Sequence, residues 1–336
     1  MPIPDPVHYP PFNITRAGHV RVTVRDLDAA RDFYTSVYGL IVSDEADGAL
    51  YLRGVEEVCH HSLVLTAAGD GPLCERIGLR VQTEEELDKA HDWFCGEGLG
   101  PAWVEQPWQG RTLHVTDPCG VPLELCASMT AVPRLGSAVD RHRGGVALRF
   151  DHFQILVPDA QAACDFYTRL GFRVSDYVET PDGALVAAFM YRKDIPWDLV
   201  FFAAKGPRMH HFAYITPNAV DMFRACDIAG IRGYGEAVER GPGRHSMGHV
   251  QYVYFRDPDG HRSELVLDAP HHMTDLENEP VQWTPASIGE KAWGLPAQRA
   301  WFLEASRFPG VEPVETSVAR GALTLEDYLS ARTVVA

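Results

Sequence analysis

The sequence predicts an α+β fold of two tandem domains, each a pair of βαβββ modules forming a curved mixed sheet around a cavity, with a C-terminal capping tail. Two observations predict it. The first half of the chain recurs in the second half, and each half repeats a strand, a helix and three further strands. With 336 residues and 46% hydrophobic content, the chain is large enough for two globular domains.

The opening unit of each half is the clearest repeat. The stretch GHVRVTVRDLDAARDFYTSVYGL, from Gly18 to Leu40, matches DHFQILVPDAQAACDFYTRLGF, from Asp151 to Phe172. Both read as a strand, a turn built on Asp and an amphipathic helix. His19 and His152 occupy the same place in this unit. The tetrapeptide DGAL then recurs in each half before an apolar strand.

The second module of each half repeats as well. IGLRVQTEEELDKAHDWFCGEGLG aligns with HHFAYITPNAVDMFRACDIAGIRGYG, and this alignment sets Gly78 opposite His211. VTDPCGVPLELC aligns with FRDPDGHRSELVL, so that Glu124 and Glu264 correspond. The DPxG segments have the residues of tight turns, which places both glutamates on a final strand.

The limits of the repeat predict the domain boundaries. We expect an N-terminal βαβββ-repeat domain without a functional metal site at residues 15–130 and a C-terminal catalytic βαβββ-repeat domain at 149–268. Residues 131–148 read as a connector. The stretch 269–336, rich in Pro and Trp, does not repeat and is expected to cap the second domain.

Composition excludes several classes of function. A net charge of −16, from 46 acidic and 30 basic residues, repels nucleic acid and anionic membrane surfaces. No apolar run approaches the roughly 20 residues of a membrane span, and the N-terminus has no signal-peptide pattern, so we expect a cytoplasmic protein. The seven cysteines are scattered without a CxxC pair, which argues against disulfides and thiolate metal sites.

Three residues at matched strand positions of the second half form a candidate metal site, namely His152, His211 and Glu264. Two imidazoles and a carboxylate are the ligand set of non-haem Fe(II) sites that keep open positions. Any one of them alone would more often be a packed core or surface residue. The first half has His19, Gly78 and Glu124 instead, so it should not hold metal tightly.

The adjacent pair His210 and His211 begins an apolar strand. Neighbours on a strand point to opposite faces, so we expect His211 to face the cavity and His210 to face away from it.

Several motifs together resemble one known family. These are LRFDHF, GFRVSDYV, MYRK, GPRMHHFAY, ERGPGRH, YVYFRDPDGHRSEL and WFLEAS, spread through the second half. With them the chain resembles the type I extradiol ring-cleavage dioxygenases of the vicinal oxygen chelate superfamily, in the homoprotocatechuate 2,3-dioxygenase branch. The resemblance runs from about residue 15 to 305.

The resemblance implies an Fe(II)-dependent dioxygenase that uses O2 to cut the ring of a substituted catechol next to its diol. It implies His152, His211 and Glu264 as ligands of Fe(II), with Mn(II) as the metal of some members. It also implies a small aromatic substrate and a homo-oligomer. It further implies Tyr254 and His245 in catalysis and Arg240 at the site. We also expect Gln154, Phe189 and Trp197 in the substrate pocket.

The sequence departs from the family at Trp197. The family carries a histidine in this strand, whereas an indole only donates a hydrogen bond and cannot shuttle protons. Either Tyr254 or His245 takes over the proton work, or the substrate ionises unaided, or the reaction is not ring cleavage. Trp197 could also stack against a bulky aromatic substrate.

A second departure concerns the substrate. Gly289 and Glu290 stand where the homoprotocatechuate branch grips a carboxylate with an Arg pair, and Lys291 and Arg299 are offset from it. A two-pronged carboxylate contact is therefore not expected. The sequence predicts a catechol without the acetate side chain.

Two other functions stay open at this point. One is a metal-dependent enzyme of the same superfamily that does not use oxygen, such as an isomerase, epimerase or thiol transferase. The other is a non-catalytic ligand-binding protein, which would need no tightly bound metal.

Overall fold

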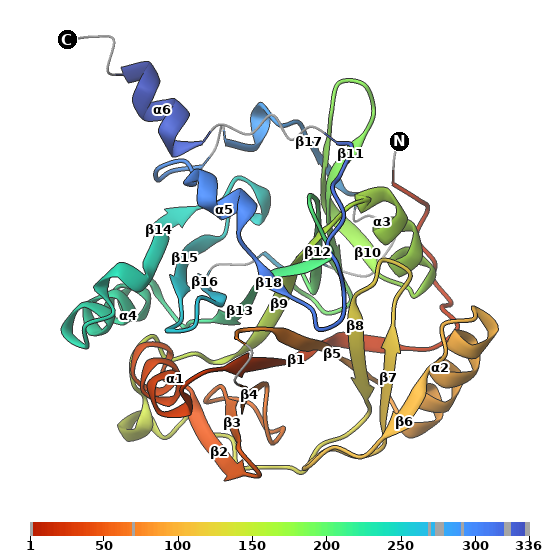
Figure 1. Ribbon diagram of the computed structural model, residues 1–336, viewed down its shortest axis with the longest axis horizontal. Helices are drawn as coiled ribbons and strands as arrows, with labels where there is room; N and C mark the ends of the chain where they lie inside the picture. Colours follow the sequence, from red (N-terminus) through yellow and green to blue (C-terminus); the bar gives the residue numbers. More distant parts are fainter. Residues whose placement is uncertain are drawn as a thin grey trace.

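The computed structural model describes residues 3–68, 71–267, 270–272, 279–289, 292–318 and 324–332. The repeat of the sequence appears as two sheets, one in each half of the chain, and the fold class predicted above is confirmed. In Figure 1 the first half, coloured red to yellow, lies below the green-to-blue second half. The expected boundary between the second domain and the tail, at 268–269, lies outside the described residues.

The first half forms an eight-stranded mixed sheet in the order β2-β3-β4-β1-β5-β8-β7-β6. Each module contributes four neighbouring strands, and the two modules meet at the antiparallel pair β1–β5. The elements are β1 (Ile14–Val24), α1 (Leu27–Phe33), the π-helical turn η1 (Tyr34–Tyr38), β2 (Ile41–Ala46), β3 (Ala49–Arg53), β4 (Leu63–Ala67), β5 (Cys74–Val81), α2 (Glu84–Gly96), β6 (Ala102–Val104), β7 (Thr112–Thr116) and β8 (Pro122–Cys126).

The second half repeats this plan around the antiparallel pair β9–β13, in the order β14-β15-β16-β13-β9-β12-β11-β10-β17. After the short helix η2 (Val139–Arg141), the elements are β9 (Arg149–Val157), α3 (Ala160–Arg169), β10 (Arg173–Glu179), β11 (Leu185–Tyr191), β12 (Leu199–Ala203), β13 (Arg208–Ile215), α4 (Ala219–Ile231), η3 (Gly235–Ala237), β14 (Val238–Arg244), η4 (Met247–His249), β15 (Gln251–Arg256) and β16 (Arg262–Leu267).

The helices begin at matching caps in the two halves. Asp26 and Asp159 accept hydrogen bonds from backbone N–H groups at the start of α1 and α3. Thr83 and Asn218 do the same for α2 and α4. A side-chain oxygen at this position satisfies donors that the helix itself cannot, which explains why the turn before each helix is polar.

The strand register corrects one expectation from the sequence. Arg21 pairs with Arg76 in the first half, and at the same place in the second half Gln154 pairs with His211. The residue that corresponds to His211 is therefore Arg76, and the expected correspondence with Gly78 is wrong. It failed because the segment between the two central strands is longer in the second half. Gly78 pairs with Glu124 as Ala213 pairs with Glu264.

The two halves share one hydrophobic core and two matching hydrogen bonds. Tyr34 of the first half donates to Asp257 of the second at 3.0 Å, and Tyr167 donates to Asp117 at 2.8 Å. Both aspartates belong to the DPxG turns, and both tyrosines belong to the DFYT helices. Burial raises the pKa of Asp117 to about 6.

The described part of the C-terminal tail packs against the second half. Its elements are β17 (Val281–Trp283), η5 (Ser287–Gly289), α5 (Arg299–Leu303), β18 (Ser306–Arg307) and α6 (Leu325–Arg332). β17 extends the sheet beside β10, β18 pairs with β13, and α6 projects from the body in Figure 1.

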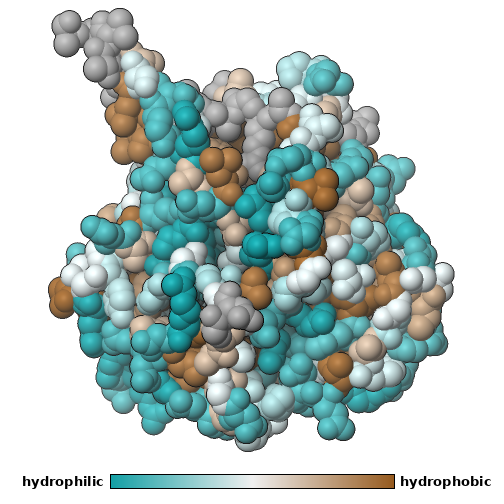
Figure 2. All heavy atoms as spheres, viewed as in Figure 1, coloured by the Kyte–Doolittle hydropathy of each residue, from teal (hydrophilic) through white to brown (hydrophobic). Residues whose placement is uncertain are grey.

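The outer surface is mixed in polarity. On the face drawn in Figure 2, brown apolar residues form small separate groups among teal polar ones. Among the described residues, none of the helices combines the length and the apolar character of a membrane span.

Candidate metal centre and substrate cavity

Three side chains from the centre of the second sheet converge on one point. The Nε2 atoms of His152 on β9 and His211 on β13 lie 3.2 Å apart. The same oxygen of Glu264 on β16, Oε2, lies 3.3 Å from the first and 3.2 Å from the second. Ligands at right angles around an ion with bonds of about 2.1 Å lie about 3 Å apart, so this triangle has the dimensions of a metal site.

Glu264 supports this reading. The residue is fully buried, and neither of its carboxylate oxygens has an aligned hydrogen-bond donor. A buried carboxylate without a partner is costly unless a cation neutralises it. Burial alone would raise the pKa of Glu264, but the surrounding imidazoles of His152, His211 and His245 outweigh burial and hold it well below its usual range.

The two imidazoles differ in their tendency to hold a proton. Burial lowers the pKa of His152, but the neighbouring carboxylates of Asp151 and Glu264 outweigh burial and raise it to about 9. Burial lowers the pKa of His211 to about 4, with Glu264 opposing. His152 Nδ1 lies 2.7 Å from Asp151 Oδ2, and a carboxylate bound to Nδ1 fixes the ring so that Nε2 faces the triad.

A β-bulge in each central strand directs these histidines. On β9, residues 151 and 152 together lie opposite Ala213, and on β13 an extra residue lies between Met209 and His211. A bulge breaks the alternation of faces and re-aims side chains. The first half has bulges at the same places, between Ala17 and His19 and between Arg21 and Val22.

The bulge on β13 overturns the expectation for His210. Instead of facing away, His210 lines the same cavity as His211, and the Nδ1 atoms of the two rings lie 2.8 Å apart. Its Nε2 lies 2.9 Å from the backbone oxygen of Trp301 in the tail. The strict alternation assumed from sequence does not hold where an extra residue is inserted in the strand.

A cavity of about 470 Å³ opens at the triad. Its walls come from β11, β12 and the tail and are mainly apolar, including Phe189, Val200, Phe202, Ile288, Leu295 and Phe302. The cavity is therefore larger than a catechol ring needs, and one side of it suits an apolar substituent.

The predicted pocket residues line this cavity. Trp197 is 4% exposed, and its ring meets His152 edge-on at 5.2 Å and Phe189 at 5.7 Å. Its indole Nε1 is buried without a hydrogen-bond partner. Gln154 lines the wall beside His211. The guanidinium of Arg240 lies over the rings of three aromatic residues, Tyr252, Tyr254 and Trp301.

Tyr254 and His245 form a hydrogen-bonded pair at the triad. The tyrosine hydroxyl lies 2.8 Å from His245 Nε2, and that nitrogen lies 3.6 Å from Glu264 Oε1. Burial, with Glu264 adding to it, raises the pKa of Tyr254 well above its usual range, and burial lowers the pKa of His245. The tyrosine thus keeps its proton, and the histidine is neutral and can accept one.

Sequence reasoning missed several residues of the site, namely Asp151, Lys193, His210, Ser246 and Trp301. The repeat also identifies the residue of the first half that corresponds to Trp197. Ser62 and Asp198 accept hydrogen bonds from the matching residues Val20 and Phe153. The residue before each of them is therefore also matched, which makes His61 the counterpart of Trp197.

The first half has a corresponding triad of His19, Arg76 and Glu124, and hydrogen bonds to the glutamate close it. His19 Nε2 lies 2.6 Å from Glu124 Oε1, His114 Nε2 lies 2.7 Å from Oε2, and Gln109 donates to Oε1 at 2.7 Å. Burial alone would raise the pKa of Glu124, but the bonds from His114 and His19 outweigh it and hold the pKa well below its usual range. Among the described residues, His152, His211 and Glu264 are the group that has metal-site spacing.

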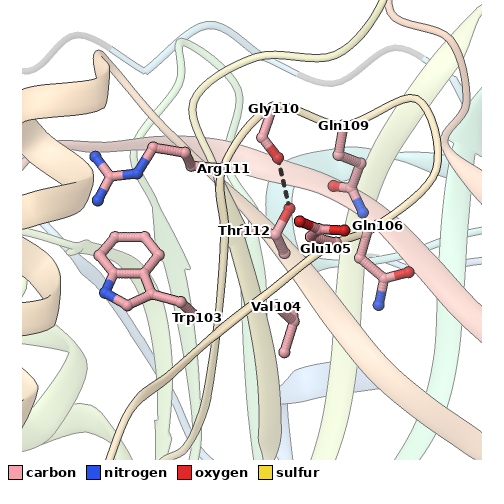
Figure 3. Close-up of a pocket in the computed structure, with 8 residues that line it drawn as sticks. All are labelled: Trp103, Val104, Glu105, Gln106, Gln109, Gly110, Arg111 and Thr112. Carbon is pink, nitrogen blue, oxygen red and sulfur yellow. Dashed lines mark hydrogen bonds between the residues drawn. The ribbon is translucent and has the colours of Figure 1, made fainter.

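A larger hollow, of about 620 Å³, lies elsewhere in the first half. It lies along β6, β7 and the loop between them, and Figure 3 shows Arg111 lying near Trp103 on one side and Gln106 and Gln109 on the other. The Arg111 guanidinium is 4.1 Å from the Trp103 ring centre. Its lining includes Glu105 but no histidine or cysteine, so the candidate chemistry belongs to the smaller cavity.

Comparisons with known proteins agree with this placement. A family model described as "Glyoxalase/Bleomycin resistance protein/Dioxygenase superfamily" matches residues 16–125 and 149–265. The chain is 30% identical to the metapyrocatechase of Pseudomonas sp. (strain CF600) over 291 residues, which cover 82% of this chain and 93% of the relative. It is 27% identical over 294 residues to the manganese-dependent 2,3-dihydroxybiphenyl 1,2-dioxygenase of Geobacillus genomosp. 3, covering 82% of this chain and 92% of the relative.

A solved structure is similar over nearly the whole chain. It is the anaerobic complex of homoprotocatechuate 2,3-dioxygenase from Brevibacterium fuscum with 3,4-dihydroxyphenylacetate. The TM-score is 0.85 at 33% identity, with 93% of this chain and 99% of the other covered.

Proposed function

Because the chain belongs to the Glyoxalase/Bleomycin resistance protein/Dioxygenase superfamily, we propose that it is an extradiol dioxygenase that cuts the ring of a substituted catechol next to its diol. One observation supports the proposal most strongly. The triad of His152, His211 and Glu264 has metal-site spacing, and its carboxylate lacks aligned donors at the end of an apolar cavity.

We propose that His152, His211 and Glu264 hold Fe(II), with Mn(II) as the alternative that the Geobacillus relative suggests. Two imidazoles and one carboxylate leave coordination positions free for substrates. An ion held there supplies a Lewis acid that brings a catechol and O2 together and lets electrons pass between them. Both oxygen atoms enter the product, a muconic semialdehyde, so no further reductant is needed.

The pair of Tyr254 and His245 is proposed to handle protons. His245 Nε2 can accept a proton from the catechol, since its pKa lies below the usual range and it is neutral at pH 7. The hydroxyl of Tyr254 stays protonated and can donate a hydrogen bond to a substrate oxygen. Trp197 adds a second donor, its unpaired Nε1, but cannot exchange a proton.

The cavity favours a catechol with an apolar substituent. Among the described lining residues, Arg240 is the one arginine or lysine, and it is covered by aromatic rings. Arg299 is exposed and lies 3.6 Å from Asp327, away from the cavity. Glu290, one of the two residues at the place of the family's Arg pair, and Lys291, which is offset from that place, lie outside the described residues. A single cation gives an anionic side chain a weaker hold than an arginine pair.

The function is tested by loading the protein anaerobically with Fe²⁺ or with Mn²⁺, adding a catechol and then admitting O2. We expect a yellow ring-opened product, formed faster from neutral and bicyclic catechols than from homoprotocatechuate. His211→Ala is the control and should give none. Absence of product across the catechol panel, with metal bound, would instead favour an enzyme of this superfamily that does not use oxygen.

The expected homo-oligomer is carried forward as a proposal. Light scattering on the purified protein measures the mass directly, and a mass of 37.3 kDa, that of one chain, would contradict it.

A further inference from the structure

A buried ion pair beside the triad has no part in the chemistry proposed so far. Lys193 Nζ lies 2.7 Å from Asp198 Oδ1, and the two side chains are 15% and 0% exposed. Both residues belong to the connection between β11 and β12. Burying two charges carries a desolvation penalty that a pair seldom repays by attraction alone. What the pair holds in place is therefore informative.

The lysine ammonium has two further acceptors. It donates to the backbone oxygen of Asp151 and, at 3.1 Å, to the backbone oxygen of Trp197. The three N–H groups of the ammonium thus match three acceptors. Asp151 lies in the bulge of β9, where the regular ladder is interrupted and a buried carbonyl needs another donor. Lys193 supplies that donor.

Asp151 in turn orients the first residue of the triad. Its Oδ2 lies 2.7 Å from His152 Nδ1, and both residues are buried. The other carboxylate oxygen of Asp151, Oδ1, is buried without a hydrogen-bond partner. A shift of this backbone would therefore pass directly to the imidazole. Lys193 reaches His152 through Asp151.

The repeat separates this role from a general structural one. Asp198 accepts the N–H of Ala17 at 2.6 Å, and in the matching place Glu57 accepts the N–H of Phe150 at 3.1 Å. Both halves thus use a buried acid to bind the other half.

The lysine contact is what differs. By strand register, Gly18 and Ser62 of the first half correspond to Asp151 and Asp198. The Ser62 hydroxyl donates to Glu57 at 2.6 Å, whereas the Asp198 carboxylate accepts from Lys193. The ammonium therefore accompanies the half whose triad is open, and is absent from the matching contacts of the half whose triad is closed.

We propose that Lys193 is a positioning residue of the metal centre: its ammonium fixes the Asp151 carbonyl at the bulge, and through it the imidazole of His152, while also fixing the backbone of Trp197. This rests on the proposed function only in taking His152, His211 and Glu264 as the metal ligands. Removing the Lys193 ammonium should weaken metal binding by about 10–100-fold, as the loss of a hydrogen-bond partner behind a metal ligand generally does.

The test measures binding of Mn²⁺ to the full-length apoprotein by electron paramagnetic resonance of the free ion. Lys193→Met keeps the length of the side chain and removes its charge, and we expect about 10–100-fold weaker binding. In an Asp151→Asn background the same change should have little further effect, because the pathway through the carboxylate is already weakened. Unchanged binding, or the same loss in both backgrounds, would overturn the proposal.

Arg169→Gln is the matched control. It breaks an exposed pair with Glu97, joined by two hydrogen bonds of 2.9 and 2.6 Å, that also connects the two halves but lies away from the triad. Mn²⁺ binding should not change. If Lys193→Met does not fold, Lys193→Arg replaces it, since a planar guanidinium keeps the charge but cannot reproduce three bonds from one nitrogen. Wild-type Mn²⁺ affinity in that variant would contradict the proposal.

The outcomes distinguish this inference from the proposed function. Wild-type protein that binds no Mn²⁺ would remove the metal centre itself. Wild-type protein that binds Mn²⁺ but cleaves no catechol would remove the reaction and leave the positioning role testable as described.

Discussion

The two halves of the molecule have a buried histidine and a buried glutamate at matching strand positions, but the two glutamates differ in their hydrogen bonds. In the first half, Glu124 is fully satisfied by hydrogen bonds, two from histidines and one from Gln109. In the second half, Glu264 has no aligned donor and faces two imidazoles at metal-ligand spacing. From this difference we infer that Glu264 is available to a metal ion because no aligned donor binds it, whereas the hydrogen bonds to Glu124 leave it unavailable.

The two halves also differ at the position of His211, where the first half has Arg76. It takes the place of His211 in the register, and its charge interacts with Glu124 while burial lowers its pKa. A guanidinium cannot ligate a metal and is always charged, so the first half replaces the charge of an ion with a fixed cation.

Exchanging the matched residues His211 and Arg76 should have the largest effect on metal binding and turnover. Installing the first half's residue, His211→Arg, removes a ligand and adds a positive charge, so we expect loss of bound metal and at least a 100-fold loss of turnover. The reciprocal Arg76→His should leave metal content at one per chain, because Glu124 remains held by its three donors. Elemental analysis and steady-state kinetics check both. A second ion in the Arg76→His protein would show that hydrogen bonding does not close the first triad.

Neutralising each glutamate should lower stability by different amounts. In metal-free protein Glu124→Gln weakens bonds to a satisfied carboxylate and should lower the free energy of unfolding by about 1–3 kcal/mol. Glu264→Gln removes a buried charge that the neighbouring imidazoles balance but that no aligned donor binds, and should lower the free energy of unfolding by less than Glu124→Gln does. Urea denaturation of chelator-treated proteins measures both. Equal destabilisation would mean that the two carboxylates are held alike.

Replacing Trp197 by the residue of the first half sharpens the comparison at the cavity. Trp197→His mimics His61 and removes an indole that packs on Phe189 and His152. We expect the preference for a bicyclic over a monocyclic catechol, as a ratio of kcat/KM, to fall by about tenfold, which is the scale of one aromatic contact. An unchanged ratio would place Trp197 in packing alone.

The last prediction concerns the pH dependence of the hydrogen bonds between the halves. The pKa of Asp117 is about 6 in the folded protein, above the value of about 3.9 in an unfolded chain. The folded state therefore binds this proton more tightly, so the contribution is present below about pH 4 and is lost as the pH rises through 6, by at most about 2–3 kcal/mol. Asp117→Asn should flatten this part of the pH profile of unfolding. A profile identical to that of the wild type would contradict the assignment.

Much of the fold could be predicted from sequence because the repeat provides an internal alignment. The order of strands and helices, the capping turns and the apolar strands all follow from local patterns that occur twice. The alignment of β5 with β13 could not be predicted, because a length difference upstream moved Arg76 out of alignment with His211.

The site was predictable where it depends on residue type and not where it depends on backbone irregularity. His152, His211 and Glu264 were identified together, but the side occupied by His210 depends on a bulge that no residue pattern marks. The contacts of Lys193 were equally hidden, since its ammonium binds backbone oxygens and one of these, that of Asp151, lies 42 residues away in the chain. The correspondence of His61 with Trp197 could have been predicted from the repeat, because His61 lies one residue before Ser62 as Trp197 lies one residue before Asp198.

The most direct test is a crystal of protein loaded with Fe²⁺ or Mn²⁺ and an anomalous difference map recorded at that metal's absorption edge. We predict one strong peak per chain, bounded by His152, His211 and Glu264, and no peak between His19 and Glu124. Density of equal height in both halves, or none in the second, would contradict the claim that withheld hydrogen bonds separate a metal centre from its closed counterpart.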